Sequence, residues 1–353
     1  MRCHTDFAPS VRTLGVAGAL CIAMAAGGLT AQPSQYRLID LGPIGFTPDP
    51  EDWGTFGINN RGWAVWFSYD SGFYTAHVYR ANEALPQDRI VDIAALIPAT
   101  PAENVARDIN DCGLVVGQSD SDLPVHDSGS LRGDGQAVVW DLVAGTQHAL
   151  PVSSWSSGVA ISNSDPAVIV GETQILGKCW ECDPEVTDTP FVASFRHVFG
   201  SPGSELLLQL TGPPDCDQAA IAADVATGSA GENIVGASQS LPVTGRCPID
   251  FEPPDSCTNA DDLQDAARLS TVPGMTERLP AHSLNREGQA FGVSEDGFAA
   301  GWGYRYEGIS DCPVDPFVWD LNGAPATSVV LPMPLDQFDD RLSGKALAVT
   351  ASQ

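Results

Sequence analysis

Short apolar runs separated by turn-forming residues recur along this chain. Residues 106–117 give the clearest case: Ile109 is followed by Asn110, Asp111, Cys112 and Gly113, and then by the apolar run 114–116 and Gly117. Asn and Asp tolerate left-handed backbone angles and Gly accepts a positive φ, so this order predicts a tight hairpin. The apolar run predicts a strand that is buried on both faces and ends at Gly117. Residues 136–140 and 148–151 predict two further strands, which makes four strands in the unit.

The same unit repeats, with starts near residues 58, 109, 161, 225, 293 and 349. Four short strands per unit suit the blades of a β-propeller, with the extra length placed in loops. A unit of this size cannot bury its own apolar face, so neighbouring units must stack to form a core. We therefore predict an all-β, propeller-like fold of about five to six four-stranded units, forming a single domain over residues 32–353.

Two tryptophans, Trp140 and Trp319, occupy the same place near the end of their strands. This fixed place in the repeat predicts that they pack between neighbouring units. The alternative is a platform on which carbohydrate rings stack.

The two ends of the repeat region do not match. Residues 36–42 resemble the last segment of a unit, and residues 345–353 resemble the first segment of the next one. We therefore expect the sequence given to stop within a sixth unit, just where a Gly-x-Val-Val-Gly stretch is due. The alternative is a five-unit ring with spare strands at its edges.

These units resemble the extracellular HAF repeats of bacteria, whose consensus is roughly Ala-x-x-Ile-Asn-x-x-Gly-x-Val-Val-Gly, then His-Ala-Phe-hydrophobic-Trp, then Leu-Pro or Asp-Leu-Gly. Units two, three and five carry the resemblance, and residues 36–42 are similar to the opening of such proteins. Gln136, Thr189 and Asp315 stand where the family has its histidine. The resemblance implies an exported, propeller-like repeat protein with no established activity.

The composition narrows the classes of partner. The chain has 17 Lys and Arg residues and 45 Asp and Glu residues, which gives a formal net charge of −28. Nucleic acid is excluded as a partner, because binding it requires neutralising phosphates with Lys and Arg. Docking on anionic membranes is equally disfavoured. Thirty-five Gly and 27 Pro agree with many turns between short elements.

The amino terminus predicts export. Arg2 and Arg12 precede an apolar stretch over residues 14–26, and small residues follow up to Ala31, so residues 1–31 form an expected signal peptide. An uncleaved anchoring helix is the alternative. No other stretch is long enough to span a membrane. The expected location is outside the cell, in the periplasm or on the cell surface.

Removal of residues 1–31 leaves seven cysteines in an oxidising compartment, where disulfides form. Six lie in long insertions and are the disulfide candidates: Cys179, Cys182, Cys216, Cys247, Cys257 and Cys312. The short loop between Cys247 and Cys257 makes them the favoured pair. The other connectivities stay open. Cys112, in the tight turn, is the expected free thiol. Cys179 and Cys182 lack the strand–helix context of a redox site and the second close cysteine pair of a zinc site. We therefore interpret them as structural cysteines that hold their loop in place.

No motif for a nucleophile, a metal or a nucleotide occurs, so no catalytic residue and no cofactor site is predicted. His77, between Ala76 and Val78, is interpreted as a packed residue. Clustered carboxylates could hold a calcium ion, and a solvated acidic loop is the alternative. Its candidate ligands are Asp250, Glu252, Asp255, Asp261 and Asp262.

Two function classes remain open. The favoured one is a noncatalytic binding module that holds an unknown protein or glycan through its inter-strand loops, because the residues fixed across units are turn and core types. The alternative is a secreted hydrolase of a polysaccharide or ester with carboxylates in a propeller funnel. An enzyme should show a polar residue that breaks the repeat without a turn to explain it.

Overall fold

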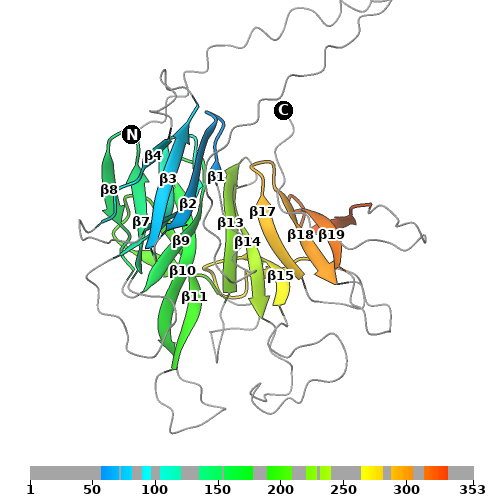
Figure 1. Ribbon diagram of the computed structural model, residues 1–353. Coiled ribbons are helices and arrows are strands. Elements are labelled where there is room, and N and C mark those ends of the chain that lie inside the picture. Colours follow the sequence, from blue (N-terminus) through cyan, green and yellow to red (C-terminus); the bar gives the residue numbers. More distant parts are fainter. Residues whose placement is uncertain are drawn as a thin grey trace, which may run out of the picture. The chain divides into compact units, whose positions relative to one another are not determined.

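The computed structural model describes residues 57–70, 73–81, 90–96, 104–120, 135–152, 155–177, 189–208, 220–228, 231–239, 264–280, 288–304 and 314–332. All of them belong to one compact unit, Pro43–Gln353. Their regular structure is entirely β: five four-stranded antiparallel sheets follow one another along the chain (Figure 1). No helix in these ranges is long and apolar enough to cross a membrane.

Each sheet is built from four strands that are consecutive in the chain and paired in that order. The first sheet holds β1 (Gly57–Ile58), β2 (Trp63–Asp70), β3 (Phe73–Arg80) and β4 (Ile90–Asp92). The second holds β5 (Asn104–Ile109), β6 (Leu114–Asp120), β7 (Gly135–Asp141) and β8 (Thr146–Ala149). The third holds β9 (Ser156–Ile161), β10 (Val168–Gly177), β11 (Thr189–Val198) and β12 (Ser204–Leu206).

The last two described sheets follow the same plan. The fourth holds β13 (Ala220–Gly228), β14 (Gly231–Gln239), β15 (Gln264–Leu269) and β16 (Glu277–Arg278). The fifth holds β17 (Gly288–Val293), β18 (Phe298–Tyr304), β19 (Val314–Asp320) and β20 (Thr327–Val330). The all-β repeat of four-stranded units is therefore confirmed, and the predicted starts at 58, 109, 161, 225 and 293 all fall in the first strand of a sheet. The predicted start at 349 lies outside the described residues.

The turn between the first and second strands of a sheet has the predicted chemistry. Gly113 takes a φ of 84° and Gly297 a φ of 80°, both in the left-handed region. The side chain of Asn110 accepts hydrogen bonds from the backbone N–H groups of Cys112 and Leu114, which closes the turn. Its amide nitrogen donates to the carbonyl oxygen of Ser162 at 3.0 Å, so the same side chain also ties the second sheet to the third.

A chain of exposed side chains repeats this linkage at the surface. The backbone and side-chain N–H groups of Asn60 donate to the carboxylate of Asp111 at 2.8 Å. The backbone N–H of Asp111 donates to Oδ1 of Asn163 at 2.8 Å, and Nδ2 of Asn163 donates to Oε1 of Glu295 at 3.0 Å. The first turns of sheets one, two, three and five therefore lie together at one end of their sheets.

A β-bulge interrupts the first strand of sheets two to five, and it explains a recurring glycine. In the second sheet the register between β5 and β6 shifts between Ala106 and Asp108, so Arg107 is the extra residue. A Cβ placed on Gly117 would lie 1.9 Å from the carbonyl oxygen of Val105. Gly117 lies inside β6, so the expectation that the apolar strand ends there is wrong. The equivalent glycines are Gly171, Gly236 and Gly301, at 2.2, 1.9 and 2.0 Å from a facing carbonyl oxygen.

Consecutive sheets bury apolar side chains between them. Four clusters join sheet one to two, two to three, three to four, and four to five. Trp140 is 3 % exposed in the first cluster and Trp319 is fully buried in the last. The predicted packing role of these tryptophans is confirmed, since neither ring is available as a carbohydrate platform. Within the described ranges, no apolar cluster joins the fifth sheet to the first.

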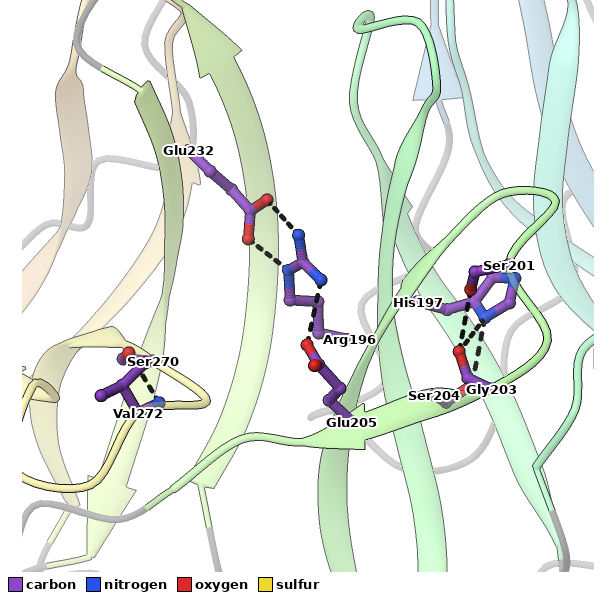
Figure 2. A network of polar contacts seen from close by, with 9 residues as sticks. All are labelled: Arg196, His197, Ser201, Gly203, Ser204, Glu205, Glu232, Ser270 and Val272. Atoms are coloured by element: carbon purple, nitrogen blue, oxygen red, sulfur yellow. Dashed lines mark hydrogen bonds and ion pairs between the residues drawn. The ribbon is translucent and has the colours of Figure 1, made fainter.

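Sheets three and four are also joined by an ion pair with two parallel hydrogen bonds (Figure 2). Arg196 on β11 donates from Nε and Nη2 to Glu232 on β14 at 2.6 and 2.7 Å, and from Nη1 to Glu205 on β12 at 3.1 Å. The hydrogen bonds to Glu232 are the main cause that raises the pKa of Arg196. This geometry matches the planar guanidinium to a carboxylate, so we assign the cluster to holding the two sheets together.

Candidate functional site

Two carboxylates stand out on the first strands, because the repeat does not require them. Asp108 on β5 and Asp224 on β13 directly follow the extra residue of the bulge. The equivalent positions of the other sheets, assigned from the strand register, hold Gly57, Ala160 and Gly292. The repeat therefore accommodates this position without any side-chain oxygen, and carboxylates occur in two sheets of the five described.

Each carboxylate holds two backbone N–H groups from two different sheets. Asp108 accepts from Ile109 at 2.7 Å and from Ile161 of the third sheet at 2.9 Å. Asp224 accepts from Val225 at 2.8 Å and from Val293 of the fifth sheet at 2.8 Å. These four N–H groups are equivalent in the repeat, so two aspartates supply acceptors to four sheets.

Burial dominates the electrostatics of this pair. It raises the pKa of Asp108 to about 6, even though the two N–H groups favour the ionised form. Burial also raises the pKa of Asp224 to about 7, and the negative charge of Asp108 adds to this rise. Asp108 and Asp224 thus repel each other when both are ionised, although they lie on the second and fourth sheets, and both residues are partly exposed.

These shifts predict that the protein loses stability as the pH rises. Unfolded aspartate titrates near 3.8, so between pH 4 and pH 7 the folded chain holds more protons on Asp108 and Asp224 than the unfolded chain. Stability must then fall across this window as the pH increases. We expect a fall on the order of a few kcal/mol between pH 4 and pH 8, measured as the free energy of unfolding in urea.

The other carboxylates of this acidic chain also contribute to the pH dependence, so a matched variant is needed. In Asp108→Asn with Asp224→Asn the two titrating groups are gone, and the slope between pH 4 and pH 7 should be much shallower. An identical slope in the double variant would contradict the raised pKa values.

The chemistry of this arrangement is that of a structural clamp. A glycosidase uses one carboxyl group as an acid and a second as a base or nucleophile, and both must reach the substrate. Here every carboxylate oxygen of the pair already accepts a backbone N–H group. The pair therefore serves mainly to join the second sheet to the third and the fourth sheet to the fifth.

Most of the residues singled out from the sequence lie outside the described residues. This holds for the calcium candidates Asp250, Glu252, Asp255, Asp261 and Asp262, and for the disulfide candidates Cys179, Cys182, Cys216, Cys247, Cys257 and Cys312. Calcium binding and the pairing of Cys247 with Cys257 stay predictions. Among the described ranges, no group of three or more His, Cys, Asp or Glu side chains is placed to hold a metal ion.

Two predictions on described residues need revision. Cys112 is disulfide-bonded, so the expectation of a free thiol there is wrong; its partner lies outside the described residues. His77 does pack, against Trp66 with the ring centroids 5.3 Å apart. It also makes hydrogen bonds to Ser68 and Asp92, which the packing interpretation did not include.

The sequence did contain a signal for Asp108 and Asp224. Units two and four place an aspartate directly before the apolar residue that opens the unit, while the other units place Gly or Ala there. No known family model matches this chain. No curated protein matches it either.

Proposed function

We propose that the protein is an exported binding module with a propeller-like scaffold. One observation carries the proposal: the connections between second and third strands all leave the same end of the sheets and differ widely in length. They cover residues 71–72, 121–134, 178–188, 240–263 and 305–313. At the opposite end the first turns are short, and those of sheets one, two, three and five are tied to one another by hydrogen bonds.

The shared end follows from the strand directions. The first turns of sheets one, two, three and five lie together, and each second strand runs away from its turn. A Cβ on Gly228, which ends β13, would lie 1.8 Å from the carbonyl oxygen of Glu295, so the fourth sheet shares this orientation. The connection from each second strand to the third must therefore begin and end at the far end of its sheet.

The propeller-like arrangement is supported by the way the sheets pack. Each described sheet buries apolar residues against the next, and the first turns of the non-neighbouring sheets three and five meet in the hydrogen bond from Asn163 to Glu295. The expected signal peptide and the resemblance to HAF repeats support export. Variable loops at one end of a regular scaffold are a common way to present a binding surface.

The charge of these connections favours a cationic partner. Each of the four longer connections carries more Asp and Glu than Lys and Arg. Carboxylates in connections that start and finish at one end of the sheets would attract a basic protein surface or a glycan with amino groups, and would repel nucleic acid. The alternative of a hydrolase with carboxylates in a funnel has less support, because Asp108 and Asp224 are engaged by backbone N–H groups.

The proposal is tested by binding of cationic probes. Chitosan oligomers and polylysine serve as probes, and dextran serves as the neutral control. We expect binding to both cationic probes that weakens between about 50 mM and 500 mM salt, because screening shortens the range of exposed charges.

Variants at the two ends give the matched comparison. Replacing Asp250, Glu252, Asp255, Asp261 and Asp262 by their amides should weaken binding. Glu295→Gln with Asp296→Asn, at the opposite end, should leave it unchanged. Equal losses in both variants, or cationic probes bound no better than dextran, would overturn the proposal.

A further inference from the structure

The first sheet holds a serine, a histidine and an aspartate in a continuous hydrogen-bonded line. Oγ of Ser68 on β2 lies 2.7 Å from Nε2 of His77 on β3. Nδ1 of His77 lies 2.8 Å from Oδ1 of Asp92 on β4. The strand register explains the arrangement, because His77 is directly opposite both Trp66 and Asp92, and Ser68 is two residues beyond Trp66 on the same face.

The chemistry of the three groups fixes the direction of these hydrogen bonds. An ionised carboxylate only accepts, so Nδ1 of His77 donates to Asp92. In the neutral ring Nε2 is then the acceptor, and the hydroxyl of Ser68 donates to it. The imidazole is thus held in the tautomer that can remove a proton from the serine, with the aspartate on its far side.

The scaffold explains the serine but not its two partners. A hydroxyl recurs at this place in the second, third and fourth sheets, as Ser119, Thr173 and Ser238. Ser119 accepts from the backbone N–H of Leu96, and Thr173 donates to the carbonyl oxygen of Trp155, so both serve the main chain.

The place of His77 holds an apolar residue in each of the other four described sheets, and the place of Asp92 holds an apolar residue in three of them. The equivalent pairs are Val138 with Ala149, Phe195 with Leu206, Ala267 with Arg278, and Phe317 with Val330. His77 therefore breaks the repeat where no turn requires a polar residue.

The other described histidines lack the full line. His148 lies beside the hydroxyl of Thr146 at 3.1 Å, and His197 lies near the hydroxyl of Ser204 and the carbonyl oxygen of Gly203. Figure 2 shows the surroundings of His197, whose pKa is lowered chiefly by burial. Among the described residues, only His77 joins a hydroxyl on one nitrogen to a carboxylate on the other.

We propose that Ser68 is an activated nucleophile that accepts an acyl group from small esters. Oγ bonds to the ester carbonyl carbon while the carbon–oxygen bond to the alcohol breaks. His77 takes the proton from Oγ and passes it to the departing alcohol. Water then attacks the acyl-serine, again through His77, releasing the carboxylic acid and restoring Ser68.

The partial exposure of Ser68 and His77 admits small substrates, and the high exposure of Asp92 limits the expected rate of ester hydrolysis. The side chain of His77 is 16 % exposed and Ser68 is partly exposed, so a reagent reaches the line without unfolding the sheet. Asp92 is 75 % exposed, so water weakens its hold on the imidazole. Asp92 is thus a positioning residue with a smaller effect than His77.

The test is covalent labelling of the whole protein by a fluorophosphonate, followed by intact mass and peptide mapping. We expect one adduct on Ser68, formed with loss of fluoride. Ser68→Ala should abolish it, and His77→Gln should slow it by about 100-fold or more. His148→Gln is the matched control, since His148 also faces a hydroxyl but lacks a carboxylate, and its labelling rate should equal that of the wild type.

Further measurements distinguish a loss of reactivity at Ser68 from a loss of folding. Urea unfolding midpoints verify that each variant folds. Asp92→Asn should slow labelling by about 10-fold and remove the Nδ1–H preference of His77 in ¹⁵N NMR, while Asp92→Glu should restore both. An adduct at any residue other than Ser68, no adduct on the folded wild type, or wild-type labelling of folded His77→Gln would overturn the proposal.

Discussion

Gly117→Ala should destabilise the protein by about 3 kcal/mol or more, which makes it one of the most damaging single methyl groups that the chain could accept. The added Cβ would lie 1.9 Å from the carbonyl oxygen of Val105 and 2.9 Å from its carbonyl carbon. Neither atom belongs to a flexible side chain, so β5 or β6 must move as backbone. That movement would disturb the bulge and the hydrogen bonds of Asp108 beside it.

The measurement is the urea unfolding midpoint, with Gly203→Ala as the control. Gly203 has open space around its Cβ position and no positive φ. Its substitution should therefore change the midpoint little. Gly171→Ala, Gly236→Ala and Gly301→Ala should behave like Gly117→Ala, because each would place a Cβ within 2.2 Å of a carbonyl oxygen. Equal midpoints for Gly117→Ala and Gly203→Ala would show that Gly117 does not lie so close to the carbonyl oxygen of Val105.

Asp108→Ala is expected to cost about 2 to 5 kcal/mol at pH 5. The substitution leaves the N–H groups of Ile109 and Ile161 without their acceptor, and each such buried group costs about 1–3 kcal/mol. At pH 5 the carboxyl group is largely protonated, since its pKa is about 6, so the loss of acceptors is seen without relief of a buried charge.

The loss should shrink at pH 8, where removing Asp108 also removes its repulsion of Asp224. Urea unfolding at both pH values measures the difference. Asp108→Asn keeps one acceptor oxygen and should fall between Asp108→Ala and the wild type. The exposed Asp296 provides a control, since Asp296→Ala should change stability little at either pH. A larger loss for Asp108→Ala at pH 8 than at pH 5 would contradict this account.

The repeat could be predicted because residues that are neighbours in the sequence determine each of its turns. Within five residues, the sequence indicates the end of a strand at Ile109, a turn at Asn110 and a positive φ at Gly113, and the structure has all three there. The role of Gly117 was less accessible. Its sequence position suggests a strand end, but the carbonyl oxygen of Val105 that forbids a side chain is known only once the register is known.

The polar sites depend on contacts between distant residues. Asp108 acts on Ile161 in the next sheet, and Asp224 acts on Val293, 69 residues away. Ser68, His77 and Asp92 meet only because three strands pair in one register. Inspecting His77 alone therefore indicates a packed residue, while the loops that carry the predicted cysteine pairs and calcium ligands offer no periodic pattern to constrain them.

The sharing of one carboxyl group by two sheets has a consequence for how such a chain can gain or lose units. Asp108 serves sheets two and three, and Asp224 serves sheets four and five. Deleting the third sheet alone would set Asp108 beside a sheet whose N–H group already has Asp224 as its acceptor. Deleting the third and fourth together would instead present Asp108 with the N–H group of Val293. Units two to five thus form an array whose copy number changes most easily in steps of two.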